Sequence, residues 1–303
     1  MDSSNKNPFG RYSVAIAFST YNNSPHVKNT IDSILSQNHS NIYVSIADDG
    51  SHDNTVNDIY ESLSSFDRFS ISKLDHGERG IARKTSIDNA LDKSPDFIFI
   101  IDSDMVLKEN LLTDVLAFFE KKPNVGALVI PEIPFSLHKN YFSKVKVFER
   151  SIINNAGSDI GKNSIEAARF WRTDEYIRSG GIDSSQISFE ETQPTIRYME
   201  SGGIIKRALF TGVYHDEKKV TFQNIISKKR YYFSHMDKTI ENEERGFLKA
   251  LSRWYFFRPV LYRWINIKKY IRHPLLFMGM LWMYMCLSAV GAFEMAKSAA
   301  KKA

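Results

Sequence analysis

Short apolar runs alternate with segments of helical periodicity through the first half of the chain. The apolar runs are typical of buried strands, and the segments between them repeat apolar residues every three or four positions. We predict strands at residues 13–18, 43–47, 69–72, 97–101 and 126–130, and helices at 27–35, 81–91 and 111–119. This order predicts an α/β fold in which a mostly parallel sheet is connected by crossover helices.

Three polar clusters each follow a predicted strand. They read Ser-Thr-Tyr-Asn-Asn at 19–23, Asp-Asp-Gly-Ser at 48–51 and Asp-Ser-Asp at 102–104. Open parallel sheets bind their ligands beyond the carboxyl ends of the strands. We therefore expect the three clusters to share one site.

The second half of the chain is less regular. From residue 131 to about 164 the periodicity weakens, and Pro131 and Pro134 interrupt it, so this segment is expected to shape a cleft. Regular elements resume at 168–171, Gly180 and Gly181 indicate a turn, a helix is predicted at 192–200, and a strand is predicted to end at Tyr214. Beyond residue 246 aromatic and basic residues dominate, and we place a domain boundary there.

Asp102 and Asp104 directly follow an apolar strand, which makes them candidates for a hard-cation site. Mg²⁺ or Mn²⁺ prefers oxygen ligands and commonly uses one or two carboxylates together with substrate phosphates. The alternative is a solvated loop in which an aspartate caps the next helix. The same two interpretations apply to Asp48 and Asp49, where a turn and a helix cap are the default.

The net charge of +5 is concentrated toward the C-terminus. Seven basic residues follow one another there with no acid between them: Lys249, Arg253, Arg258, Arg263, Lys268, Lys269 and Arg272. Such a cluster suits anionic lipid head groups or nucleic acid. The uncharged run at 275–293 approaches the length of a bilayer span, so a membrane is favoured and no nucleic acid partner is expected. Because Gly279, Gly291 and Glu294 weaken a spanning segment, a soluble helix buried in a dimer is the alternative.

Cysteine use and charge distribution indicate a cellular location. The single cysteine, Cys286, lies in the apolar run and excludes both a disulfide framework and a cysteine-based zinc cluster. The first residues lack the basic and then apolar pattern of a cleaved signal. Basic residues are more numerous before the 275–293 run than after it. The positive-inside tendency therefore predicts a location at the cytoplasmic face of a membrane, either associated with it or held by a single C-terminal span.

Five sequence blocks, in order and spacing, resemble the family 2 glycosyltransferases, whose nucleotide-sugar domain has the GT-A fold. The blocks are Ser-Thr-Tyr-Asn at 19–22, Ser-Ile-Leu-Ser-Gln at 33–37, Ala-Asp-Asp-Gly-Ser at 47–51 with Asp-Asn at 53–54, Gly-Ile-Ala-Arg at 80–83 with Asn89, and Ile-Asp-Ser-Asp at 101–104. The resemblance extends from Tyr12 to Tyr232. It implies a catalytic domain over residues 1–246, with a nucleotide-sugar half at 1–130 and an acceptor half at 131–246, followed by a membrane-associated tail at 247–303.

The resemblance also implies roles for individual residues. Nucleotide-sugar binding falls to Thr20, Tyr21, Asn22, Asp48, Asp49, Arg83, Asp102 and Ser103. Within this set, Tyr21 would offer a flat face to the base and Asp49 would accept a hydrogen bond from it. Asp48 could hold the loop, and Arg83 would face the diphosphate, a task suited to a planar, permanently charged group. Mg²⁺ or Mn²⁺ would be bound by Asp104, Asp102 and His215, although a histidine at a strand end is more often structural.

The acceptor side matches the family less tightly. Residues 170–183 resemble the segment before the family's acidic motif, and Phe-Glu-Glu-Thr at 189–192 falls where that motif is expected. Glu191, with Glu190 beside it, would then be the catalytic base, although the family usually has aspartate there. The alternative is a pair of first-turn acids that complement a helix dipole. A lipid phosphate acceptor would need no base, because its oxygen is already ionised.

The expected function is therefore inverting, metal-dependent transfer of a sugar from a nucleotide diphosphate sugar, with UDP-sugars favoured. A glycan or a lipid-linked acceptor, such as a polyprenyl-linked one, would receive the sugar at the membrane face. Two alternatives remain open. One is a catalytically silent scaffold of the same fold that binds nucleotide or membrane, and the other is a nucleotidyltransferase. The sequence does not specify the sugar, the acceptor or the oligomeric state.

Overall fold

The computed structural model describes residues 9–77, 79–154, 166–183, 192–234 and 255–302. The chain forms two compact units. The first comprises Met1–Ile133 and Gly157–His215, and the second comprises Pro134–Ala156 and Asp216–Ala303. Each unit therefore contains two separate stretches of sequence.

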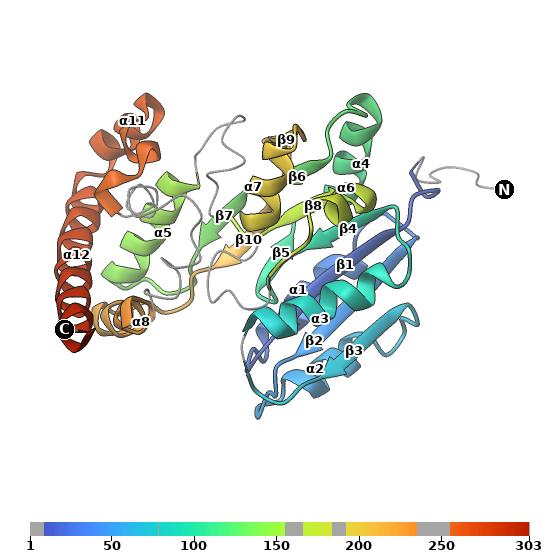
Figure 1. The fold of residues 1–303 in the computed structure, drawn as a ribbon, viewed down its shortest axis with the longest axis horizontal. Coiled ribbons are helices and arrows are strands. Elements are labelled where there is room, and N and C mark those ends of the chain that lie inside the picture. The colour runs from blue at the N-terminus through green and yellow to red at the C-terminus, as the bar shows by residue number, and fades with distance from the viewer. Residues whose placement is uncertain (1–8, 78, 155–165, 184–191, 235–254, 303) are drawn as a thin grey trace. The chain divides into compact units, whose positions relative to one another are not determined.

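The first unit is built on a seven-stranded sheet with the order β3-β2-β1-β4-β8-β6-β9 (Figure 1). The strands are β1 (Val14–Thr20), β2 (Ile42–Asp48), β3 (Phe69–Lys73), β4 (Phe97–Ile100), β6 (Ala127–Val129), β8 (Arg169–Arg172) and β9 (Ile205–Arg207). Strands β3, β2, β1 and β4 are parallel neighbours, whereas β8 runs antiparallel to both β4 and β6. The predicted α/β fold with a mostly parallel sheet is confirmed.

Helices cover both faces of this sheet. Successive side chains of a strand point to opposite faces, and here both sets are apolar and need to be buried. Val14, Ile16 and Phe18 of β1 belong to one core, together with apolar residues of α1 (His26–Leu35), α2 (Thr55–Ser62) and α4 (Leu111–Lys121). Ala15 and Ala17 belong to the other core, with residues of α3 (Arg79–Leu91), α6 (Thr173–Arg178) and α7 (Thr192–Glu200). The small side chains of β1 on the second face leave room for α3 to approach closely.

A second, three-stranded sheet has the order β5-β10-β7. Its strands are β5 (Met105–Leu107), β10 (Val213–Asp216) and β7 (Glu132–Phe135). The antiparallel register of β10 and β5 places His215 opposite Met105, the residue after Asp104. Pairing in this small sheet therefore brings a histidine beside the second aspartate of the Asp-Ser-Asp cluster.

The second unit is largely helical. Its elements are α5 (Tyr141–Ile153), α8 (Phe222–Ser234), the short 3₁₀ helices η2 (Tyr255–Phe257) and η3 (Pro259–Tyr262), α11 (Trp264–Arg272) and α12 (Pro274–Lys302). Helix α12 packs against both α5 and α8. The weak periodicity at 131–164 did not predict α5, although Val145, Phe148 and Ile152 are buried at helical spacing. Two prolines just before this helix obscured its beginning.

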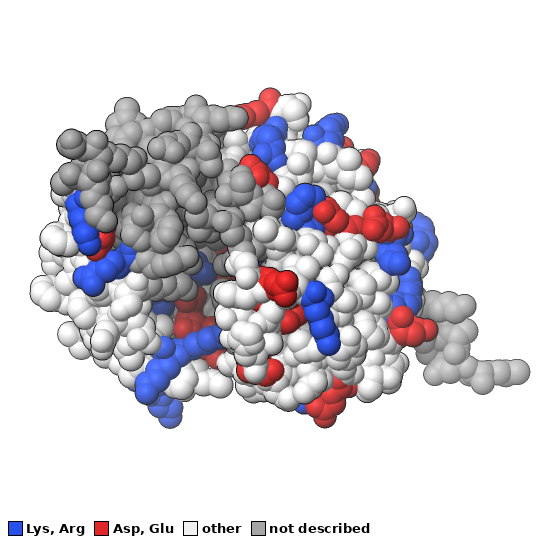
Figure 2. All heavy atoms as spheres, turned by 60° about the horizontal axis from the view of Figure 1, so that its bottom comes forward, with Lys and Arg blue, Asp and Glu red and all other residues white. Residues whose placement is uncertain are grey.

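On the face drawn in Figure 2, basic and acidic side chains are mixed over the residues that the structure describes. Several form local pairs at the surface, such as Lys28 with Glu61 at 2.7 Å and Lys84 with Asp88 at 2.7 Å. Exposed pairs of this kind contribute little to stability, because water and salt screen them. The buried charged residues indicate the candidate site better than these surface pairs do.

Candidate active site

The three polar clusters lie at the carboxyl ends of adjacent parallel strands. Thr20 at the end of β1 pairs with Asp48 at the end of β2, and Ala17 pairs with Ile100 near the end of β4. The backbone N–H of Asp49 donates to the carbonyl oxygen of Thr20 at 2.9 Å. The sheet thus brings together the segments that the sequence predicted to share one site.

Asp48 and Asn22 hold the loop that follows β2. The Asp48 carboxylate accepts hydrogen bonds from the backbone N–H of Ser51 at 2.9 Å and from its hydroxyl at 2.5 Å. The side-chain oxygen of Asn22 accepts from the backbone N–H of His52 at 2.8 Å, and the φ of Asn22 is 45°. Asparagine tolerates this left-handed conformation better than most residues. Both side chains therefore shape the site through the loop.

Tyr21, His76 and Asp49 form a stacked group at the site. The rings of Tyr21 and His76 are nearly parallel, with centroids 4.1 Å apart. Nδ1 of His76 lies 3.1 Å from the Asp49 carboxylate, which also accepts from the backbone N–H of Gly77 at 3.1 Å. A Cβ at Gly50, whose φ is 74°, would come within 2.7 Å of the backbone nitrogen of His76, so this close approach requires glycine. His76 lies in the connection between β3 and α3, and no sequence motif indicated it.

Arg83 and Asp102 form an ion pair beyond the carboxyl end of β4. Arg83 extends from α3, its side chain is only 1% exposed, and its guanidinium donates to the Asp102 carboxylate, which is 20% exposed. A buried guanidinium needs such a partner, because leaving its charge unpaired in a low-dielectric environment is costly. In this state Arg83 therefore fixes the orientation of Asp102.

Asn23 and Thr30 fix the loop that contains Ser103. The side-chain amide of Asn23 donates to the Ser103 carbonyl oxygen at 2.8 Å and contacts its hydroxyl at 3.0 Å. The Thr30 hydroxyl donates to the same carbonyl at 2.8 Å. These contacts hold the backbone between Asp102 and Asp104 in one conformation. Thr20 is buried beside this region, and its hydroxyl finds no partner among the described residues.

His215 lies between two carboxylates. Its Nε2 is 3.5 Å from Asp104, and its Nδ1 is 3.1 Å from Glu132. Burial by itself would lower the pKa of His215, but the contacts with Asp104 and Glu132 outweigh that effect and raise the pKa well above its usual value. A proton or a cation on the Asp104 side of the imidazole is therefore electrostatically favoured.

Glu132 connects His215 to a buried polar network. One Glu132 oxygen accepts from the backbone N–H of Ala167 at 2.7 Å, and the Glu132 backbone N–H donates to Glu166 at 3.1 Å. Glu166 is fully buried and accepts two hydrogen bonds from Arg207, at 2.9 and 2.5 Å. Glu132 was not predicted from the sequence, because it follows no motif and its partner is 83 positions away.

The donor set at Asp104 and His215 fits a divalent cation. A carboxylate oxygen and an imidazole nitrogen are suitable ligands, and a carboxylate that receives the other ring nitrogen commonly orients a ligating histidine. Across the described ranges, no three histidine, cysteine or acidic side chains form a complete ligand cluster. Two protein ligands leave coordination positions for a diphosphate, as Mg²⁺ and Mn²⁺ sites often do.

The predicted catalytic pair, Glu190 and Glu191, lies outside the described residues. The helix predicted after it is present as α7, which starts at Thr192. The position of these two glutamates relative to Asp104 therefore stays a prediction.

Residues 15–172 match the model of the family described as "Glycosyl transferase family 2". This match covers the strand-end clusters, Arg83, Asp102 and Asp104. The chain belongs to glycosyl transferase family 2. It is a glycosyltransferase, as the sequence predicted, and its fold is GT-A.

One relative supports this assignment from sequence. The chain is 28% identical over 183 residues to the poly(ribitol-phosphate) β-N-acetylglucosaminyltransferase TarP of Staphylococcus aureus strain N315, which is 54% of this chain and 54% of TarP. The chain thus spans about half the length of this relative.

Solved structures show the same fold at low identity. The S. aureus TarS fragment 1–349 in complex with UDP-GlcNAc has a TM-score of 0.55 at 15% identity, covering 91% of this chain and 81% of that one. The mannosyltransferase PcManGT from Pyrobaculum calidifontis, in complex with GDP-Man and Mn²⁺, has a TM-score of 0.54 at 16% identity, covering 96% and 81%. Similar folds thus bind nucleotide sugars, and one does so with a divalent metal.

Proposed function

We propose that this family 2 glycosyltransferase is an inverting, divalent-metal-dependent enzyme that uses a UDP-sugar. The observation that supports this most is the arrangement of Asp104, His215 and Glu132 beside the carboxyl ends of β1, β2 and β4. The names of TarP and of the TarS complex favour UDP-N-acetylglucosamine as the first donor to test.

The nucleotide is proposed to bind at Tyr21 and Asp49. The aromatic face of Tyr21, a residue that is 41% exposed, suits stacking with a base. Asp49 already accepts from Gly77 and contacts His76, and a carboxylate has acceptor capacity for a further N–H, such as that of uracil. His76 stacks where a base could stack, so base binding is expected to move His76 or to use the other ring face.

The diphosphate is proposed to lie near Asp104 and His215, where Mg²⁺ or Mn²⁺ would be held. When bound, this cation neutralises the charge that develops on the departing nucleoside diphosphate. Arg83 acts here through Asp102, which it holds in place for contact with the ribose, the sugar or the cation. Ser103 contributes its backbone, which Asn23 and Thr30 fix.

The acceptor hydroxyl is proposed to attack the anomeric carbon as the bond to the diphosphate breaks. Its proton would pass to Glu191, because a base must lie within hydrogen-bond reach of the attacking oxygen. Glu190 would flank this base. A glycan or a lipid-linked acceptor, such as a polyprenyl one, is proposed. An ionised lipid phosphate would need Glu191 only for orientation.

The second unit is proposed to attach the enzyme to the cytoplasmic face of a membrane. One helix among the described residues, at Pro274–Glu294, is apolar and long enough to cross a bilayer by length and composition alone. Its exposed apolar residues share one stripe of α12, which we call the apolar stripe: Leu275, Met278, Trp282, Met285 and Phe293.

The opposite side of α12 packs against protein. Tyr284 is buried and donates to Glu149 of α5 at 2.9 Å, and Gly279 lies so close to Tyr141 and Val145 that a Cβ would meet them at 2.3 and 2.7 Å. A helix with one face on charged α5 and an apolar opposite face suits an orientation parallel to the membrane surface. This favours a helix that lies on the membrane over one that spans it.

The test of the proposed chemistry is UDP release from a panel of nucleotide sugars, with Mn²⁺ and after metal removal. We expect one donor to support turnover with Mn²⁺, and Asp104→Asn to lower that turnover by about 10²- to 10³-fold, since charge stabilisation on a leaving group is worth roughly 3–4 kcal/mol. Asp92→Asn, at an exposed residue just after α3, is the matched control. Equal, metal-independent turnover by all three proteins would refute the proposal.

A further inference from the structure

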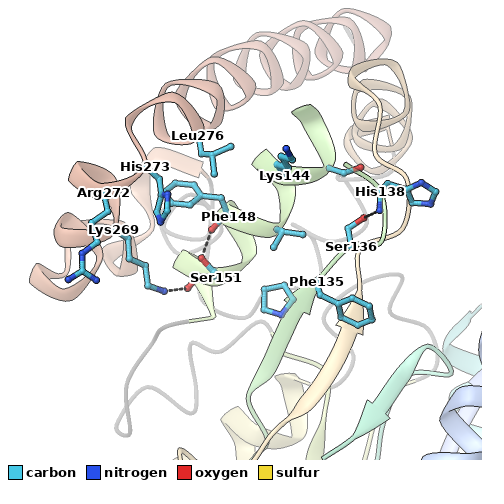
Figure 3. A pocket seen from close by; sticks show the side chains of 13 residues that line it. Phe135, Ser136, His138, Lys144, Phe148, Ser151, Lys269, Arg272, His273 and Leu276 are labelled. Atoms are coloured by element: carbon cyan, nitrogen blue, oxygen red, sulfur yellow. Dashed lines mark hydrogen bonds between the residues drawn. The ribbon is translucent and has the colours of Figure 1, made fainter. Parts of the chain in front are cut away.

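A cavity of about 640 Å³ lies within the second unit, between the segment from β7 to α5 and the helices α11 and α12 (Figure 3). Its lining includes five residues with basic side chains and no acidic residue: His138, Lys144, Lys269, Arg272 and His273. Phe135, Phe148 and Leu276 supply apolar surface to the same cavity. The lining therefore combines positive charge with an apolar wall, which is the combination that an anionic amphiphile needs.

Three cations of this cavity differ from two basic residues of the neighbouring helix α5. Lys146 and Arg150 of α5 each pair with a glutamate, Glu149 at 2.7 Å and Glu217 at 2.8 Å. In contrast, no carboxylate among the described residues lies within ion-pair distance of Lys144, Lys269 or Arg272. The cavity thus brings together three cations whose charge no carboxylate of the described part of the protein neutralises.

Lys269 is the most constrained of these cations. It is half-buried, and its ammonium group donates to the carbonyl oxygen of Ser151 at 2.9 Å, as the dashed line in Figure 3 shows. Burial lowers the pKa of Lys269, and no acidic group offsets this effect. An ammonium has three donors, so two remain for an anion. A phosphate would restore the stabilisation that burial removes from the charged form.

Two residues that line the cavity are sequence neighbours of exposed apolar residues. Arg272 and Leu276 line it, and they alternate along the chain with Ile271 and Leu275, both of which are 76% exposed. Leu275 begins the apolar stripe. A molecule with its charged group at Lys269 and Arg272 could therefore extend its apolar part along the surface that is proposed to contact the membrane.

We propose that this cavity binds the phosphate head group of an anionic lipid, with Lys269 and Arg272 as its principal contacts. The apolar wall of Phe148 and Leu276 accommodates the first part of the lipid chain. This inference rests on the membrane contact proposed above, but it does not require sugar transfer. Binding of one lipid head group would fix how the second unit sits on the bilayer.

The experiment compares the binding of the full chain to vesicles of phosphatidylglycerol and phosphatidylcholine with its binding to phosphatidylcholine alone. Lys268→Met removes one charge from an exposed residue of α11 that does not line the cavity, and about a five-fold loss is expected, from ~1 kcal/mol per basic residue near an anionic surface. Lys269→Met and Arg272→Met should each lose about 20-fold or more, because a charge-assisted hydrogen bond is lost as well. Lys269→Arg should recover most of the binding.

A second arm separates a lipid from free phosphate. Dihexanoyl phosphatidic acid below its micellar concentration should bind saturably to the wild type and not to Lys269→Met. Inorganic phosphate and dihexanoyl phosphatidylcholine should bind at least ten-fold more weakly. If inorganic phosphate binds equally well, the ligand is a soluble phosphate and the lipid proposal is wrong.

The outcomes also separate this inference from the proposal beneath it. Equal losses for Lys268→Met and Lys269→Met would mean that attraction is unspecific and would overturn the cavity site alone. No binding of the wild type to either vesicle would overturn the membrane contact and the cavity site together. Melting temperatures close to that of the wild type show that each variant is folded. UDP release tests the transferase proposal independently.

Discussion

The two units use buried charge in different ways. In the first unit the ion pair of Arg83 with Asp102 and the contact of Glu132 with His215 both lie at the site formed by the strand ends. In the second unit the buried Glu149 of α5 connects this helix to other segments, through the Tyr284 hydroxyl of α12 at 2.9 Å and Arg258 at 3.6 Å. Similar interactions therefore position the candidate site in one unit and pack helices in the other. Variants of each should affect different measurements.

The largest effect is expected for Arg83→Met. Removing one partner of a buried ion pair leaves the other charge uncompensated, so unfolding should require about 3–5 kcal/mol less free energy. Donor affinity should fall as well, because Asp102 loses its orientation. Arg11→Met breaks an exposed pair with Glu120 and is the control, with little or no expected loss of stability. Urea unfolding and calorimetric UDP titration measure the two effects. Unchanged UDP affinity in a destabilised Arg83→Met variant would limit Arg83 to a structural role.

Glu149→Gln should reduce stability without changing donor affinity. Burial alone would raise the pKa of Glu149, but Lys146 and Arg258 lower it from 4.5 to about 2. A carboxylate with a lowered folded-state pKa contributes stability above pH 4.5 and loses that contribution as the pH falls toward 2, here about 3 kcal/mol.

The difference in unfolding free energy between wild type and Glu149→Gln should therefore be full at pH 7 and shrink below pH 4.5. Urea unfolding at pH 7, 4 and 3 checks this prediction. A difference that stays constant over this range would show that the charge of Glu149 is not what stabilises the helices.

A smaller effect is expected for Glu132→Gln. The glutamine can still contact His215 but has no charge, and such changes next to a metal ligand typically cost 10–100-fold in metal affinity. The affinity for UDP without metal should not change, which a purely structural defect would not reproduce. Glu61→Gln, at an exposed residue of α2, is the control. UDP titrations with and without metal distinguish a weakened metal site from a structural defect.

The sequence predicted the first unit better than the second. Strands β1, β2, β3, β4 and β6 and helices α1, α3 and α4 are present within a few residues of their predicted positions. Their strong patterns arise because the sheet is covered on both faces. Helix α5 was missed, since prolines precede it and charged residues such as Lys146 and Arg150 interrupt its apolar pattern. Lys146 is neutralised by Glu149 one turn away, and Arg150 by Glu217, which is distant in sequence.

The site residues that the sequence predicted are those that belong to motifs. The motifs indicated Asp102, Asp104 and Arg83, but a sequence does not show that Arg83 pairs with Asp102. His76 and Glu132 carry no motif, and only folding brings them to Asp49 and His215. Residues that act through a contact distant in sequence are therefore the ones that sequence patterns miss.

The most direct test of the cation site is Mn²⁺ binding in the presence of UDP. Binding is measured as the loss of the free Mn²⁺ signal in electron paramagnetic resonance. Wild type and Asp92→Asn should retain Mn²⁺, whereas Asp104→Asn and His215→Asn should each weaken retention by at least ten-fold. Equal retention by all four folded proteins would contradict the assignment of Asp104 and His215 as the residues that hold the cation.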